Sequence, residues 1–209
     1  LEWAPLKAVL LHRPGPEVED LTDPDAVQML DTIDVEQFRK EHDAMAEAYR
    51  EAGVDVFYLD PGEPVTPNNI FCADLFFMTP EGAILARPAS TVRAGEERFV
   101  ARRLAALDVP ILMSIHRDGV FEGADALWIA EDTAIVATGL RTNEAGADQV
   151  EWALRSIGAE VVRVDLPYGS MHLMGTLRLA GPEIAIGYPG RTPHRAVRAL
   201  RERGYRVLW

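Results

Sequence analysis

The chain has little cysteine and no long apolar run. Cys72 is the single cysteine among 209 residues, which excludes a disulfide framework within the chain and is typical of a reducing compartment. No apolar run approaches the ~20 residues that a membrane-spanning helix needs. Residues 1–3 carry no basic segment of a secretory signal peptide. We therefore expect a cytoplasmic protein with no membrane partner.

Positive charge is also scarce. The sequence has 21 lysines and arginines against 33 aspartates and glutamates, a net charge of −12. Binding to phosphate backbones needs a basic surface, so nucleic acid is not expected as a partner. An acidic chain agrees weakly with a cationic small substrate. The exception is a run of arginines near the C-terminus, which we interpret as a solvated or interface-facing helix face: Arg191, Arg195, Arg198, Arg201, Arg203 and Arg206.

Several ligand motifs are missing. The sequence contains neither the G-x-G-x-x-G pattern of dinucleotide sites nor a P-loop. His12, His42, His116 and His194 lack the spacing of metal ligands. The sequence therefore predicts no metal and no cofactor.

What the chain does contain is a repeated unit. Helices are expected to begin near Val35, Glu96, Glu144 and Pro193, and the last three starts recur at about fifty residues, a period typical of propellers and solenoids. The predicted class is α/β, with residues 1–209 as a single domain because no low-complexity linker separates the units. The repeats are predicted roughly at residues 1–60, 61–113, 114–166 and 167–209.

Within each unit, hydrophobic alternation, helix caps and turn residues predict the elements. Expected strands are residues 6–12, 54–59, 75–78, 83–86, 109–113, 126–129, 133–137, 159–164, 176–177, 184–186 and 205–208. Asp34 and Asn143 are expected to cap helices, while Gly53 and Gly204 end them. The longest irregular stretch, residues 15–34, is acidic and precedes the first helix. It is interpreted either as a lid over a site or as an exposed loop.

Acidic and histidine residues recur where units begin. Asp74 precedes the second hairpin, Glu122 and Asp125 precede the third, and His172 takes the matching place before the fourth. Equivalent positions in a propeller converge on its axis, so these side chains are expected to lie together. Carboxylates held in a partly buried site are costly unless they meet a cation. A planar guanidinium, with its paired N–H donors, fits a carboxylate well.

Two arginines complement this group. Arg87 ends the second hairpin and Arg141 follows the third, so each could bind a substrate carboxylate through two N–H groups. A ligand with a guanidinium at one end and a carboxylate at the other is arginine or a close derivative. Taken singly, each residue has a plainer interpretation: Asp74 as a turn acid, the arginines as surface charges and His172 as a structural histidine.

The order of these motifs resembles a known group of enzymes. The repeat, together with FEGAD at residues 121–125, RTN at 141–143 and MHL at 171–173, is similar to the guanidino-group-modifying superfamily. That superfamily includes arginine deiminase, dimethylarginine dimethylaminohydrolase, arginine dihydrolase and the amidinotransferases. The resemblance covers essentially the whole chain. It implies a five-bladed α/β propeller, the pentein fold, built from ββαβ repeats, of which about four are present here.

The resemblance also implies an activity and roles for residues. The expected enzyme is a hydrolase that acts on the guanidino C–N bond of arginine or a methylated arginine through a covalent amidino-cysteine intermediate. His172 is expected to transfer protons, and Asp74 and Glu122 to hold the guanidinium. Further substrate contacts are expected from Asn68, Phe71, Arg87, Arg141 and Asp125.

The nucleophile is the departure from the family pattern. Relatives carry their cysteine in the fifth repeat, so this chain is predicted to lack both that repeat and the nucleophile, and to be inactive as it stands. Cys72 is expected to be a buried structural thiol. Deiminases and amidinotransferases carry an aspartate at the position of Met174. The dimethylaminohydrolase branch, like this chain, lacks that aspartate.

Alternatives stay open at this point. An amidinotransferase of the same fold would pass the amidino group to an amine instead of water. A non-catalytic propeller could bind an arginine-like ligand or a macromolecule, as a ribosome anti-association factor of similar fold does. A homodimer is one assembly that the sequence leaves open.

Overall fold

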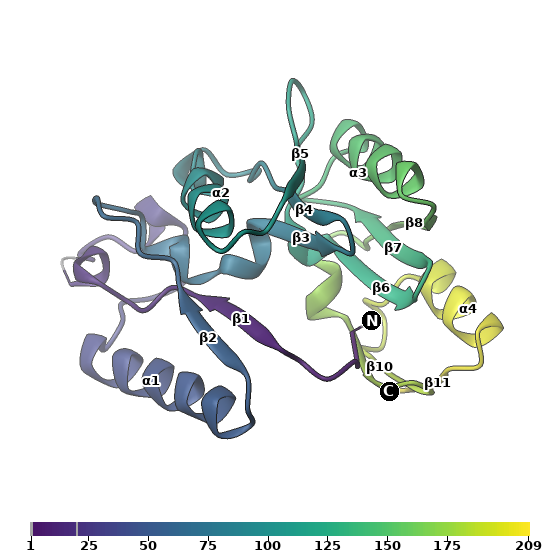
Figure 1. Cartoon of the computed structure of the whole chain (residues 1–209), viewed down its shortest axis with the longest axis horizontal. Helices are drawn as coiled ribbons and strands as arrows, with labels where there is room; N and C mark the ends of the chain where they lie inside the picture. Colours follow the sequence, from purple (N-terminus) through teal and green to yellow (C-terminus); the bar gives the residue numbers. More distant parts are fainter. Residues whose placement is uncertain (1, 20) are drawn as a thin grey trace.

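The computed structural model describes residues 2–19 and 21–209, so Asp20, within the predicted lid segment, lies outside the described residues. The fold is mixed α/β, which confirms the predicted class. In the described residues, four small sheets follow one another in sequence, each accompanied by one helix. In Figure 1 the helices lie around the outside of the arrangement.

The elements follow the predicted order. The first unit contains β1 (Ala8–Leu11), α1 (Val35–Glu51) and β2 (Asp55–Tyr58). The second contains β3 (Phe76–Thr79), β4 (Gly82–Leu85), α2 (Glu97–Ala106) and β5 (Ile111–Ser114). The third contains β6 (Ala126–Ala130), β7 (Thr133–Thr138), α3 (Glu144–Ser156) and β8 (Glu160–Asp165). The fourth contains β9 (Leu177–Gly181), β10 (Ile184–Gly187), α4 (His194–Glu202) and β11 (Arg206–Leu208).

The last three sheets share one topology. Their central strands β4, β7 and β10 pair antiparallel with the preceding hairpin strand and parallel with the strand that follows the helix. In the first sheet, β1 pairs only with β2, in parallel. Within the described residues the four sheets share no paired strands, although an isolated antiparallel bridge joins Arg87, after β4, to Phe121, before β6. The closed five-bladed propeller therefore stays a prediction.

The helix caps act as the sequence predicts. The Asp34 side chain accepts a hydrogen bond from the Gln37 N–H at 3.0 Å, and Asn143 accepts one from the Gly146 N–H at 2.8 Å. β5 begins two residues later than expected, at Ile111. The reason is that the Val109 N–H still bonds to a carbonyl of the last turn of α2.

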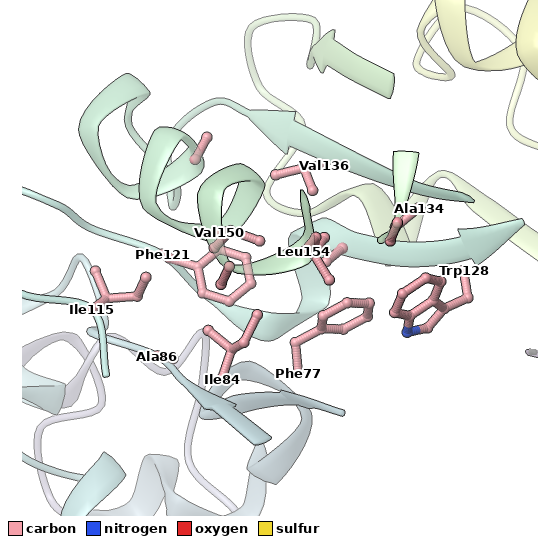
Figure 2. Close-up of a cluster of buried hydrophobic side chains, with 14 residues drawn as sticks. Phe77, Ile84, Ala86, Ile115, Phe121, Trp128, Ala134, Val136, Val150 and Leu154 are labelled. Carbon is pink, nitrogen blue, oxygen red and sulfur yellow. The ribbon is translucent and has the colours of Figure 1, made fainter. Parts of the chain in front are cut away.

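Buried apolar side chains form three clusters that link neighbouring units. One cluster joins the second unit to the third, and Figure 2 shows the Phe77 and Trp128 rings stacked there, with centroids 5.7 Å apart. Another joins the third sheet to α4 through residues such as Ile135 and Leu200. The third cluster packs Leu59 of the first unit against the second. The relative position of the units is therefore fixed by shared cores.

The N-terminal residues reach across the molecule. Glu2 accepts a hydrogen bond from the Trp128 N–H, and Trp3 packs edge-on against Tyr205 of the fourth unit at 5.8 Å between centroids. Figure 1 marks the chain ends close to each other near β10 and β11. Among the described residues, no helix has both the length and the apolar character that crossing a membrane requires. The cytoplasmic location stays a prediction.

Candidate functional site

Three short 3-10 helices form the base of the site. They are Cys72–Asp74, Gly123–Asp125 and Leu173–Gly175, and each directly precedes the hairpin of its unit. The middle one contacts the other two, so Asp74 and the two residues that start the other turns, Glu122 and His172, come together. The convergence expected from their places in the sequence is therefore present.

Gly123 allows two of these turns to approach closely. A β-carbon at this position would lie 2.1 Å from the Phe76 carbonyl oxygen and 2.6 Å from that of Ala73. Real side chains do not tolerate such distances, so any larger residue would push Glu122 away from Asp74. Close backbone packing thus explains why glycine stands at this position of the FEGAD motif.

Glu122 and His172 form the tightest contact of the group. His172 Nε2 lies 2.6 Å from Glu122 Oε2 and 3.8 Å from Asp74 Oδ1. Glu122 is fully buried, and the His172 side chain is 13% exposed. The other Glu122 oxygen accepts a hydrogen bond from the Ala89 N–H at 3.1 Å. A buried carboxylate is therefore paired with an imidazole at charge-assisted distance.

The electrostatics favour an ionised pair. Burial lowers the pKa of His172, but its hydrogen bond to Glu122 and the charges of Asp74, Asp125 and Glu122 outweigh burial, so the net pKa is raised above 6.5. Burial raises the pKa of Glu122, but the hydrogen bond and charge of His172 outweigh it, with smaller help from the Ala89 N–H and the charge of Arg93. The net pKa of Glu122 falls below 4.5. The imidazolium and the carboxylate thus stabilise each other.

A buried arginine that the sequence analysis missed completes the cluster. Arg93 is 5% exposed and donates from Nη1 to Asp74 Oδ2 at 2.6 Å and from Nε to Glu96 Oε2 at 2.8 Å. The same Nη1 lies 4.0 Å from Glu122 Oε2. The available signal was the spacing of Arg93 and Glu96, three residues apart just before α2. The cluster of carboxylates therefore already holds one guanidinium.

The cluster geometry bears on metal binding as well. Ligand atoms of Asp74, Glu122 and His172 lie within 4.8 Å of one another, a spacing that a metal ion would accept. The guanidinium of Arg93 already supplies positive charge against two of these side chains. The expectation of no metal stays a prediction.

Three further predicted residues lie beside the cluster. Arg141 Nη1 is 3.8 Å from Glu122 Oε1. The Phe71 ring, 48% exposed, lies with its centroid 5.8 Å from the Arg93 guanidinium carbon. Asn68 is buried and donates from Nδ2 to the Val27 carbonyl at 2.7 Å. All three line one cavity of about 480 Å³ together with Asp74, Arg93 and His172.

The irregular segment forms the other wall of that cavity. Gln28, Met29, Leu30, Asp31 and Ile33 line it together with residues of the cluster. Gln28 adopts a left-handed backbone conformation, with φ of 57°, at the end of a 3-10 helix. A larger cavity of about 940 Å³ opens toward β1 and α1, and both cavities reach Asp74 and His172. The segment predicted as a lid is thus next to the site.

Two predicted substrate contacts, Arg87 and Asp125, line neither of these cavities. The Arg87 side chain is exposed and lines a separate cavity of about 400 Å³, so the arginine of this region that lies beside Asp74 is Arg93. Asp125 is fully buried, and its two oxygens accept hydrogen bonds from the Thr142 hydroxyl at 2.7 Å and the Leu173 N–H at 3.0 Å. Asp125 therefore ties loops together behind the cluster.

Cys72 has the properties of an unreactive thiol. It is 5% exposed, its sulfur donates to the Asn69 carbonyl at 3.3 Å, and burial raises its pKa to about 12. A thiol of this pKa carries almost no thiolate at neutral pH.

The chain is similar in sequence to known enzymes of guanidino compounds. Residues 23–205 match the family model described as N,N dimethylarginine dimethylhydrolase, eukaryotic. The chain is 30% identical over 186 residues to a dimethylarginine dimethylaminohydrolase of Streptomyces coelicolor, covering 88% of this chain and 69% of that protein. It is 53% identical over 58 residues to an arginine deiminase of Clostridium perfringens, only 26% of this chain and 14% of that enzyme.

Solved structures share the fold at low sequence identity. A dimethylarginine dimethylaminohydrolase from Pseudomonas aeruginosa, complexed with citrulline, superposes with a TM-score of 0.71 at 20% identity, over 97% of this chain and 91% of that one. The N-terminal domain of ArgZ, a cyanobacterial arginine dihydrolase, gives 0.79 at 18% identity, over 98% and 76%. SxtG, an amidinotransferase from Microseira wollei, gives 0.74 at 15% identity, over 99% and 73%. The family match and the Streptomyces relative together show that the chain belongs to the dimethylarginine dimethylaminohydrolase family, within the superfamily of guanidino-group-modifying enzymes.

Proposed function

We propose that the cluster of Asp74, Glu122 and His172 binds the guanidinium of arginine or a methylated arginine and takes part in hydrolysis of its C–N bond. The observation that carries this proposal is the buried guanidinium of Arg93, which Asp74 binds at 2.6 Å and which lies 4.0 Å from Glu122. Arg93 binds Asp74 Oδ2, which leaves Oδ1 for a ligand guanidinium, and Asp74 lines both cavities beside the cluster. The relatives are enzymes that act on arginine or dimethylarginine.

His172 is suited to both proton transfers of such a reaction. Its raised pKa favours the protonated imidazolium, which can give a proton to the leaving amine as the C–N bond breaks. The neutral imidazole can then take a proton from the water whose oxygen bonds to the same carbon. The net change is guanidine plus water to urea plus amine. Asp74 and Glu122 stabilise the positive charge of the substrate guanidinium throughout the reaction.

The covalent form of this chemistry requires a thiolate. The thiolate would attack the guanidinium carbon, the amine would leave with the proton of His172, and water would then release the thiol. Cys72 is a poor candidate, because its pKa of about 12 leaves it protonated. That this chain lacks the nucleophile stays a prediction, as does the covalent step itself.

The carboxylate end of the substrate is proposed to face Arg141. The Arg141 side chain is 20% exposed and lies at the cavity that also contains Phe71, Asn68 and the segment from Gln28 to Ile33. The exposed Phe71 ring gives an apolar wall for the methylene chain. Arg87 was predicted to share this role, but the separate cavity that it lines favours Arg141 acting without it. The segment from Gln28 to Ile33 is proposed to close over bound substrate.

The proposal is tested by binding before turnover. Titration calorimetry with arginine, monomethylarginine and asymmetric dimethylarginine should give saturable binding, and Glu122→Gln should weaken it about 30- to 100-fold through loss of a charge-assisted contact. Glu183→Gln, in an exposed turn of the fourth unit, makes the same chemical change away from the site and should leave affinity unchanged.

Turnover then separates the candidate functions. Citrulline with ammonia or dimethylamine indicates hydrolysis, ornithine indicates further hydrolysis, and a new guanidino compound formed with an added amine indicates amidino transfer. Saturable binding without any product would indicate that the protein binds a ligand and is not a hydrolase. Absence of binding, or binding that Glu122→Gln leaves untouched, would refute the proposed site.

A further inference from the structure

We propose that Thr142 is a positioning residue of this site, which fixes the relative position of the Glu122 and His172 side chains through Asp125. The inference rests on the proposed function for its catalytic meaning. The geometry behind it, however, can be tested without any substrate. Thr142 was part of the RTN motif in the sequence, but it carried no role of its own.

The Thr142 hydroxyl makes two hydrogen bonds in a fully buried position. Thr142 is 1% exposed, and its Oγ1 accepts from the Glu122 N–H at 3.3 Å and donates to Asp125 Oδ2 at 2.7 Å. A hydroxyl has one proton to give, so the donation to Asp125 fixes its orientation and leaves its lone pairs toward Glu122. One side chain therefore contacts the backbone of one member of the pair.

Asp125 extends the contact to the other member. Its second oxygen accepts from the Leu173 N–H at 3.0 Å, and Leu173 directly follows His172 in the chain. The sequence of contacts thus runs from the Glu122 backbone, through Thr142 and Asp125, to the backbone beside His172. One end is the backbone N–H of Glu122 itself and the other is the residue next to His172, and the side chains of these two residues meet at 2.6 Å.

The same contacts affect charge. The groups that face His172 are Glu122, Asp74 and Asp125, while Arg93 and Arg141 lie against Glu122. Burial raises the pKa of Asp125 to about 6, and the Thr142 hydroxyl is the largest of the interactions that oppose this effect of burial. Without the hydroxyl, Asp125 would take up a proton at higher pH, and His172 would lose a negative neighbour.

A plainer role has to be excluded. A buried threonine can simply satisfy the polar groups around it, in which case its loss would lower stability and change nothing else. Thr142→Val removes the hydroxyl at nearly constant shape, and Thr142→Ser restores it. Thr133→Val is the matched control, because Thr133 is a buried threonine at the start of β7, whereas Thr142 lies in the loop after the end of that strand.

The deciding measurement is the pKa of His172 from imidazole NMR shifts. Thr142→Val should lower this pKa by about 0.5–1 unit. In the Thr142→Ser and Thr133→Val proteins the pKa of His172 should stay close to its value in the unsubstituted protein. A Thr142→Val protein that is less stable but titrates like the unsubstituted one would overturn the proposal. So would a Thr142→Ser protein that behaves like the valine variant.

Two further measurements test the proposal even if the Thr142→Val protein does not fold. Asp125→Asn removes the charge at constant size and should lower the His172 pKa in the same direction. In the unsubstituted protein, the Glu122 and Leu173 amide protons should follow a common titration step, that of Asp125. Separate titration of these two amides contradicts the coupling. If turnover is never found, these readouts still decide the positioning role, so the two proposals can fail independently.

Discussion

Replacement of Glu122 by glutamine should shift the titration of His172. Glutamine keeps the size of the side chain and the acceptor for the Ala89 N–H, but it removes the negative charge 2.6 Å from His172 Nε2. A hydrogen bond between charged groups contributes about 1.5–3 kcal/mol, which corresponds to roughly 1–2 pKa units. Asp74, at 3.8 Å, remains and limits the fall.

The same change has a signature in stability against pH. The raised pKa of His172 stabilises the fold fully below its ordinary value of 6.5, and this contribution is lost as pH rises through the folded value. The lowered pKa of Glu122 stabilises the fold above 4.5, and this contribution is lost as pH falls through the folded value. The difference in unfolding free energy between the unsubstituted protein and the Glu122→Gln protein should therefore be largest between pH 4.5 and 6.5.

The assay is a pair of titrations on purified protein. Imidazole NMR shifts give the His172 pKa, and urea unfolding at several pH values gives the stability difference. Glu183→Gln serves as the matched control. A His172 pKa that is the same in the Glu122→Gln and Glu183→Gln proteins would show that the 2.6 Å contact does not control this histidine, and the account of the site's electrostatics would be wrong.

Three further predictions concern packing and reactivity. Gly123→Ala should lower the unfolding free energy by about 2–3 kcal/mol in urea, since its β-carbon would lie 2.1 Å from a backbone oxygen; Gly175→Ala, with open space around it, should not. Phe77→Ala should cost about 3–5 kcal/mol and alter the fluorescence of Trp128, on which the ring stacks. Cys72 should react with a disulfide reagent at pH 8 roughly 100-fold or more slower in the folded protein than in urea, and fast labelling of the folded protein would contradict its burial.

The sequence alone predicted the local structure and the three side chains that the fold brings together in the cluster. Caps at Asp34 and Asn143 and the hairpin turns depend on neighbours within a few residues, so their positions could be predicted from residue type. The recurrence of acidic and histidine residues at unit entries was enough to select Asp74, Glu122 and His172, because equivalent positions of a repeat meet in space.

Only the tertiary structure decided which charges face one another. Arg87 was predicted as a substrate contact because it ends a hairpin. The chain turns after Ser90, however, and the 3-10 helix Thr91–Arg93 brings Arg93 against Asp74. Asp125 was expected to touch substrate, but both of its oxygens are used by Thr142 and Leu173.

The physical reason is the range of the interactions. Local hydrogen bonds and hydrophobic periodicity are encoded over a few residues and can be inferred without knowing the fold. The partners of a buried charge come from separate units, and desolvation penalises every arrangement in which that charge is left unpaired. Which arginine neutralises Asp74, and whether the Asp125 carboxylate faces the cavity or the loops, therefore depends on how the units pack. Sequence spacing by itself does not carry that information.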